Sequence, residues 1–347
     1  MRMTTEADIP MEKFTSGDYR SPQINDWCAG CGDFGILKAL QQAFVQLQLS
    51  PDRIAVFGGI GCSGKTPYYM GTNGIHTLHG RVLPFASGAK LADPELTVVA
   101  VGGDGDGLGI GAGHLINSAR HNLDLTYILF NNGVYGLTKG QPAPTLQRGE
   151  QTRSMPHAAN SGRLNPLALA LAAGYTWIAR GYSYAVDELA TLIQQAISHP
   201  GLSFIEVLQP CPTYNDLHTR EWYESTDAGD GSPRLYRLVE SDYQGCIQPG
   251  TSVNEANSIR QNCYAKVLEW GMHIPIGVFL RDLDTPVAAH GIPAEKGRSE
   301  HLQNAIDDAI NDVNFNTREH SLTDLESCYG DLKIDAYDFA TGDDNGQ

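Results

Sequence analysis

The sequence has 347 residues, of which 41% are hydrophobic and 18% charged, a composition typical of a globular protein with a sizeable core. A net charge of −16 at pH 7 argues against nucleic acid as a partner, because phosphate binding needs a basic face. The apolar runs are far shorter than the roughly 20 residues of a membrane helix, and the N-terminus lacks the apolar core of a signal peptide, so we expect a cytoplasmic protein without membrane contact.

The predicted elements begin after a polar, turn-rich N-terminal arm at residues 1–26. The first is a helix at about 33–48, in which Ile36, Leu40 and Phe44 fall on one stripe. Short apolar runs then predict strands, at 54–57, 96–101, 125–130 and 203–208. Helical patterns separate these runs, at about 111–121, 164–174 and 185–198.

Strands that alternate with helices predict an α/β fold, with a mostly parallel sheet covered by helices on both faces. In such sheets ligands bind beyond the carboxyl ends of the strands, which is where the unusual residues of this sequence fall. We expect a core at 27–235 and a C-terminal extension at 236–294 that packs on the core or on a partner. Residues 295–347 carry 13 acidic and 4 basic side chains and are predicted to form an acidic helical tail, with a helix at about 299–314.

The seven cysteines favour metal or redox chemistry, since a protein without an export signal is not expected to form disulfides. Cys28 and Cys31 form a C-x-x-C pair, which fits half of a zinc site, a redox dithiol or half of an iron–sulfur site. Cys62 and Cys211 each come just after a predicted strand, so these cysteines could converge and hold a cubane cluster. The others are expected to be buried or idle thiols: Cys246, Cys263 and Cys328.

Acidic and amide residues follow two neighbouring strands. Asp104 ends one predicted strand and Asn132 follows the next, so a carboxylate and an amide oxygen are expected on adjacent loops. Mg²⁺ prefers oxygen ligands of this kind, usually together with the diphosphate of a bound ligand. The glycines around Asp104 would let the backbone approach that diphosphate closely. A dinucleotide site is a weaker alternative, because Asp104 and Asp106 would put negative charge beside its pyrophosphate.

The stretch GGIGCSGKT contains the phosphate-binding pattern G-x-x-x-x-G-K-[ST], from Gly59 to Thr66. In a nucleotide-binding loop this pattern runs into a helix of several turns. Here Pro67, Gly71 and Gly74 follow, so no helix of useful length is predicted. We therefore expect these glycines to let the backbone pass close to a cluster and a cofactor.

A set of stretches carries a family resemblance, in the order WCAGCGDFGIL, GIGCSGKTPYY, HTLHGRVLPFASGAKLADP, GGDGDGLGIGAGH, NNGVYGLTKGQPAPT and CPTYN. Over roughly residues 20–290 they resemble the β subunit of 2-oxoacid:ferredoxin oxidoreductases, and most closely that of the 2-oxoglutarate enzymes. The resemblance implies a thiamine-diphosphate-binding fold. It also implies oxidative decarboxylation of 2-oxoglutarate to succinyl-CoA and CO₂, with electrons passing singly through a [4Fe–4S] cluster to ferredoxin, or the reverse, CO₂-fixing reaction.

Two alternatives to this activity are kept. Pyruvate-type or broad-specificity 2-oxoacid enzymes share the same motifs. A non-catalytic iron–sulfur electron carrier would contain the cysteines but would have no need for Asp104 and Asn132 at diphosphate-binding spacing.

Carried over by position, the resemblance implies three sets of site residues. The [4Fe–4S] cluster would be bound by Cys28, Cys31, Cys62 and Cys211. Mg²⁺ would be held by Asp104, Asn132 and the backbone carbonyl of Val134. Thiamine diphosphate would be contacted by Ile60, Gly61, Cys62, Ser63, His79, Gly105, Asp106, Gly136 and Leu137.

The resemblance also implies partners and substrate contacts. No glutamate matches the one expected to activate the aminopyrimidine of the cofactor, which in this family comes from the α subunit. We therefore expect activity only with α, in a dimer of αβ dimers that uses CoA and ferredoxin. Within this chain, Lys65 is expected to pair with the distal carboxylate of the substrate and Leu137 to line its pocket.

Overall fold

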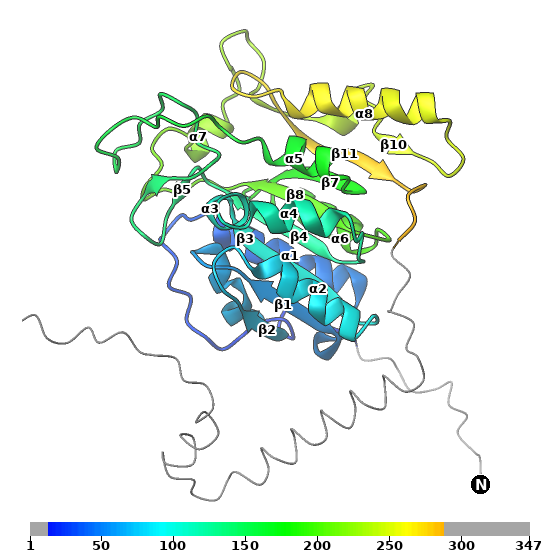
Figure 1. The fold of residues 1–347 in the computed structure, drawn as a ribbon. Coiled ribbons are helices and arrows are strands. Elements are labelled where there is room, and N and C mark those ends of the chain that lie inside the picture. Colours follow the sequence, from blue (N-terminus) through cyan, green and yellow to red (C-terminus); the bar gives the residue numbers. More distant parts are fainter. Residues whose placement is uncertain (1–12, 288–347) are drawn as a thin grey trace, which may run out of the picture. The chain divides into compact units, whose positions relative to one another are not determined.

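A nine-stranded sheet forms the centre of the fold (Figure 1). The computed structural model describes residues 13–287. The predicted tail at 295–347 and residues 1–12 of the predicted N-terminal arm lie outside the described residues. The order of strands along the sheet is β10-β11-β7-β8-β4-β3-β1-β2, with β9 paired to β11. From β2 to β7 all neighbours are parallel, which confirms the predicted α/β fold with a mostly parallel sheet.

The strands are β1 (Ile54–Gly58), β2 (Asn73–His76), β3 (Thr97–Gly103), β4 (Thr126–Asn131), β5 (Val134–Tyr135), β6 (Gln141–Pro142), β7 (Trp177–Tyr182), β8 (Ser203–Leu208), β9 (Leu235–Arg237), β10 (Cys246–Ile247) and β11 (Ile274–Asp282). β5 and β6 form a separate antiparallel pair.

The α-helices are α1 (Asp33–Leu47), α2 (Val82–Ala92), α3 (Asp104–Leu108), α4 (Ala112–Ala119), α5 (Pro166–Ala173), α6 (Val186–Ile197), α7 (Arg220–Tyr223) and α8 (Val253–Val267). Short 3₁₀ helices occur at η2 (Pro51–Arg53), η3 (Ser63–Tyr69) and η4 (Leu238–Glu240). Among the helices of the described residues, none is both long enough and apolar enough to cross a bilayer.

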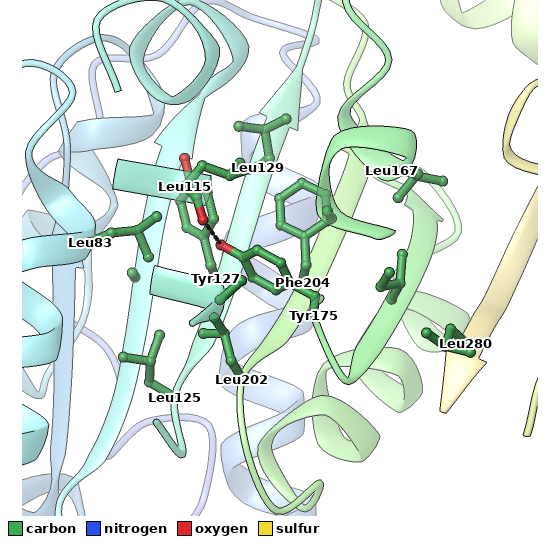
Figure 2. Packing of buried hydrophobic residues seen from close by; sticks show 14 of the residues in the cluster. Leu83, Leu115, Leu125, Tyr127, Leu129, Leu167, Tyr175, Leu202, Phe204 and Leu280 are labelled. Carbon is green, nitrogen blue, oxygen red and sulfur yellow. Dashed lines mark hydrogen bonds between the residues drawn. The ribbon is translucent and has the colours of Figure 1, made fainter. Parts of the chain in front are cut away.

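Helices cover both faces of the sheet because side chains alternate along each strand. Ala100 of β3 belongs to the cluster formed with α2, α4, α5 and α8. Its neighbours Val99 and Val101 belong to the cluster formed with α1 and α6. Figure 2 shows the first cluster, where the rings of Tyr127 and Tyr175 pack against Phe204.

The strands and helices predicted within residues 13–287 are present, with ends shifted by a few residues at most, and the helix predicted at about 299–314 lies outside the described residues. The structure adds α2, α8 and β7, which the sequence patterns did not indicate. α2 contains Pro84 in its first turn, where proline is tolerated, and Gly88 in its interior. The predicted extension at 236–294 supplies β11, which pairs antiparallel with β7 and so completes the same sheet.

Burial of His199 makes the stability of the fold depend on pH. This imidazole follows α6, is buried, and has its Nε2 2.9 Å from Thr176 Oγ1. Burial lowers its pKa from the ordinary value of 6.5 to about 4, with a smaller contribution from the positive charge of Arg281. Between these two values the unfolded chain binds a proton that the folded chain does not. The free energy of unfolding should therefore fall as the pH falls from 6.5 to 4, by about 3 kcal/mol.

Urea unfolding at pH 7 and pH 4.5 measures this effect. His199→Gln, which keeps a donor near Thr176 but does not titrate, should lose less stability than the wild type over that interval. The matched control is His157→Gln, at an exposed histidine, which should follow the wild-type pH profile. Superimposable profiles for His199→Gln and the wild type would contradict the prediction.

Candidate active site

A cavity of about 270 Å³ opens at the carboxyl ends of β1, β3 and β4. The parallel pairing of these strands brings their ends to one edge, as the sequence predicted for the ligand site. The predicted residues that line the cavity are Ile60, Gly61, Cys62, Ser63, His79, Asp104, Gly105, Asp106, Asn132, Val134, Gly136 and Leu137. The sequence motifs therefore come together in one place.

Asp104 begins α3 directly after β3 and is buried at the bottom of this site. Its Oδ1 accepts from the Gly105 amide at 3.0 Å. Its Oδ2 accepts from the Gly133 amide at 2.9 Å and from the Thr145 hydroxyl. Burial raises the pKa of Asp104 to about 6, although these hydrogen bonds act in the opposite direction. A cation beside the carboxylate would offset the cost of keeping it charged there.

Asn132 lies on the next loop and its amide has a fixed orientation. The Oδ1 atom accepts from the Val134 amide at 3.0 Å, and Nδ2 donates to Gln209 Oε1 at 2.8 Å. Within residues 13–287, no three His, Cys, Asp or Glu side chains are grouped so as to hold a single metal ion. The predicted magnesium set is of another kind, because it combines the Asp104 carboxylate with an amide and a backbone oxygen.

Asp106 joins the loops on either side of the cavity. Its Oδ1 accepts from the Ile60 amide at 2.9 Å and from the Gly80 amide at 2.8 Å, and lies 3.1 Å from His79 Nδ1. Burial raises its pKa. A Cβ on Gly59 would lie 2.1 Å from Asp106 Oδ2, so only glycine fits where the loop crosses this carboxylate. Asp106 therefore positions the loop that carries the predicted cofactor contacts.

The four cysteines of the predicted cluster come from three distant segments. A Cβ on Gly136 would lie 3.4 Å from Cys62 Sγ and 3.9 Å from Cys211 Sγ, so these two sulfurs flank one position on the cavity wall. Burial raises the pKa of Cys62 to about 12, with further contributions from the Asp33 carboxylate and from Cys211 and Cys28. Burial likewise raises the pKa of Cys31, with contributions from Cys211 and Cys62. Thiolates are unfavourable here unless a positive group compensates them.

Lys65 is not among the residues that line the cavity. Its Nζ is 2.8 Å from Asp26 Oδ2, which gives it a partner within the chain. Leu137 does line the cavity and is half exposed. After the glycine-rich loop, the chain forms the seven-residue 3₁₀ helix η3 with Pro67 inside it, not the long helix of a nucleotide-binding loop.

A buried polar network beneath the site was not foreseen from the sequence. Arg180 Nε donates to Glu206 Oε2 at 2.7 Å, and both side chains are fully buried. Glu206 Oε1 accepts from Asn131 Nδ2 at 2.6 Å. Thr145 Oγ1 lies 2.8 Å from Asn131 Oδ1 and also contacts Asp104. The network connects β7, β8 and β4 to the carboxylate that is the predicted magnesium ligand.

The sequence analysis also did not identify six residues of the cavity wall: Asp33, Gly103, Phe130, Tyr135, Thr138 and Gln209. Asp33, at the start of α1, is buried near Cys31, and burial raises its pKa to about 7. Its place two residues after the C-x-x-C pair is a signal that could have found it. Gln209 also lines the cavity, and no motif marks it.

Comparison with known proteins relates this architecture to thiamine-dependent enzymes. Residues 59–207 match the family described as thiamine pyrophosphate enzyme, C-terminal TPP binding domain. The 2-oxoacid:ferredoxin oxidoreductase subunit beta of a Sulfolobus species is 50% identical over 265 residues, which cover 76% of this chain and 83% of that protein. The 2-oxoglutarate oxidoreductase subunit KorB of Mycobacterium tuberculosis is 42% identical over 216 residues, 62% of this chain and 58% of that protein.

Among solved structures, the fold is similar to 2-oxoglutarate:ferredoxin oxidoreductase from Magnetococcus marinus, which was determined with 2-oxoglutarate, coenzyme A and succinyl-CoA bound. The match has a TM-score of 0.72 and 30% sequence identity, and covers 86% of this chain and 99% of that one.

Proposed function

Because this chain belongs to the β subunits of 2-oxoacid:ferredoxin oxidoreductases, we propose that it joins an α subunit to convert 2-oxoglutarate and CoA into succinyl-CoA and CO₂, or to run the reverse reaction. The observation that carries the proposal is the meeting of the predicted cofactor and metal residues around one cavity, with Cys62 in its wall and the Cys211 sulfur close by. Ferredoxin as electron acceptor, a dimer of αβ dimers and a cytoplasmic location are parts of the same proposal. A pyruvate or broad 2-oxoacid substrate is the alternative.

The cavity fits magnesium and thiamine diphosphate. Asp104, Asn132 and the Val134 carbonyl would hold the metal, and the buried Asp104 carboxylate gives it a negative charge to neutralise. The Ser63 hydroxyl is buried and has no hydrogen-bond partner within residues 13–287. Gly61 has φ +124° and nothing within 4 Å of its Cβ position, so the backbone is open to a ligand there. The bound coenzyme would supply the stabilisation of a carbanion, which protein side chains lack.

The cysteine site fits an iron–sulfur cluster. Cys28, Cys31, Cys62 and Cys211 would be its ligands, and a cluster would remove the cost of holding buried thiolates. Trp27 Nε1 donates to the Cys62 carbonyl at 2.9 Å and so fixes this loop between the two sites. The cluster would supply one-electron transfer.

The chain does not provide every group that the reaction needs. Among the described residues that line the cavity there is no glutamate, so the carboxylate that activates the aminopyrimidine is expected from α. The side chains of this chain bind and orient: Asp106 holds the two loops, and Leu137 offers an apolar wall to the substrate.

Purification of the αβ complex without oxygen tests the proposal. Analysis for iron, sulfide and thiamine should find all three, and the complex should reduce ferredoxin when 2-oxoglutarate and CoA are added. Iron and sulfide without thiamine would favour an electron carrier, and thiamine without iron a simple decarboxylase. A colourless complex without thiamine would overturn the proposal.

Lys65→Ala tests the proposed substrate. We propose that 2-oxoglutarate draws Lys65 from Asp26, so the change should lower kcat/KM for 2-oxoglutarate at least about tenfold more than for pyruvate, as expected for a charged hydrogen bond. Asp26→Asn, which weakens the competing ion pair, serves as the comparison and should not show this selective loss. Equal losses for both substrates in Lys65→Ala would remove the role given to this lysine.

A further inference from the structure

Gln209 lies between the two halves of the site. It follows β8 directly, as Asn132 follows β4, and the parallel register that pairs Asn131 with Leu208 sets these two residues side by side. The backbone N–H of Gln209 donates to the Asn131 carbonyl at 2.9 Å, which continues the hydrogen bonding of the sheet by one residue. The side chain is buried and reaches into the cavity wall.

Every polar atom of this side chain has a partner. Oε1 accepts from Asn132 Nδ2 at 2.8 Å. Nε2 donates to Cys31 Sγ at 3.3 Å and to the Pro210 carbonyl at 2.9 Å. A flipped Gln209 amide would place two NH₂ groups against each other and an oxygen against both a sulfur and a carbonyl. The donors and acceptors around Gln209 therefore determine which position of its side-chain amide holds the oxygen and which the nitrogen.

The fixed Gln209 amide in turn fixes Asn132. Because Asn132 Nδ2 is used by Gln209, its Oδ1 faces the Val134 amide and the cavity, where one lone pair remains for a cation. At the other end, an N–H donor to a cysteine sulfur stabilises the extra negative charge of a reduced cluster and raises its reduction potential. Gly32 leaves room for this contact, since a Cβ there would lie 2.9 Å from Gln209 Cγ.

We infer that Gln209 is a positioning residue that couples the magnesium–diphosphate site to the cluster, by orienting Asn132 and by donating an N–H···S hydrogen bond to Cys31. This inference rests on the proposed function, since it gives Gln209 a task at each of the two groups proposed there.

Two substitutions separate the tasks in the αβ complex. Gln209→Met removes all three side-chain hydrogen bonds, whereas Gln209→Glu keeps an oxygen for Asn132 and loses the N–H donor to Cys31 and to the Pro210 carbonyl. Both variants should shift the cluster's reduction potential to more negative values in an EPR-monitored redox titration. Only Gln209→Met should weaken the binding of thiamine diphosphate, by about 10- to 100-fold in calorimetry, the range for lost support of a metal ligand.

Gln248→Met is the matched control. Gln248 is exposed, and its Nε2 donates to the sulfur of Cys246 at 3.2 Å, the same kind of contact at a cysteine outside the proposed site. This variant should leave the potential and the affinity unchanged.

The outcomes separate this inference from the proposed function. A wild-type complex without iron and thiamine would defeat the proposed function. If the wild-type complex contains iron and thiamine, two results would overturn the inference alone. One is a reduction potential in Gln209→Met and Gln209→Glu that equals the wild-type potential. The other is an equal shift of the potential in Gln248→Met. If Gln209→Met yields no folded complex, the potential of Gln209→Glu decides.

Discussion

Replacing Asp104 with asparagine should abolish the joint binding of Mg²⁺ and thiamine diphosphate and, with it, the reaction. Asp104 is the buried carboxylate of the predicted metal set, and the amide of asparagine brings no charge to balance a divalent cation. Loss of a residue that only supports a metal ligand costs about 10- to 100-fold in affinity, so loss of the charged ligand itself should cost at least that much. Calorimetric titration of the αβ complex with the coenzyme and Mg²⁺ measures the change.

Asp104→Asn changes the charge of the side chain while changing its shape very little, which makes the test specific. Asparagine has nearly the same shape as aspartate and can still accept from the Gly105 amide, so the fold should persist. Asp187→Asn, at an exposed position of α6 that does not line the cavity, removes an equal charge and should bind the coenzyme as the wild type does. Binding of Mg²⁺ and coenzyme by Asp104→Asn with unchanged affinity would show that this carboxylate is not the ligand.

Replacing Arg180 with methionine should lower the free energy of unfolding by about 3–5 kcal/mol, the usual cost of removing one partner of a buried ion pair. Arg180 and Glu206 are both fully buried, and Arg180 also donates to the Pro275 carbonyl at 3.3 Å. Without the guanidinium, the buried Glu206 carboxyl group would lose its ion-pair partner and keep the Asn131 amide as a hydrogen-bond donor. Urea unfolding of the purified chain gives the difference.

Two comparisons identify the cause of that loss. Arg180→Met combined with Glu206→Gln replaces the unpaired buried carboxyl group with a neutral amide and should recover part of the stability. Arg237→Met breaks a 2.6 Å ion pair with Glu188 in which both side chains are more than two-fifths exposed, so it should cost at most about 1 kcal/mol. Equal losses for Arg180→Met and Arg237→Met would contradict the importance given to burial.

The regular parts of the fold could be predicted because their signals are local. Strands β1, β3 and β4 are short apolar runs between turn residues, and the stripe of α1 repeats with helical spacing. The sequence analysis did not predict β7 because Arg180 interrupts its apolar pattern, and a charged residue normally indicates the surface. Only the tertiary structure brings Glu206 beside it. The sequence analysis did not predict α8 because this helix is polar around most of its circumference and buries only a few side chains.

The same distinction explains what was found and what was missed at the site. Asp104, Asn132 and Cys62 lie in glycine-rich motifs, which mark them in the sequence whatever the rest of the chain does. Gln209 lies in no such motif, and Thr145 ends the quoted stretch that begins at Asn131 without any local sign that it contacts Asp104. Both contacts depend on the register between strands and on a loop that returns to the sheet. Register is a property of paired strands, so a single segment does not contain it.

The cysteines of the proposed cluster lie in segments that are far apart in the sequence, which determines when all of them are available during synthesis of the chain. Cys62 follows β1 and Cys211 follows β8, and two other strands separate β1 from β8 in the sheet. A growing polypeptide that has not yet emerged past position 211 offers an incomplete set of thiolates, however well its early portion has folded. Under the proposed function, we therefore expect the cluster to be completed only after Cys211 has emerged from the ribosome and β8 has joined the sheet.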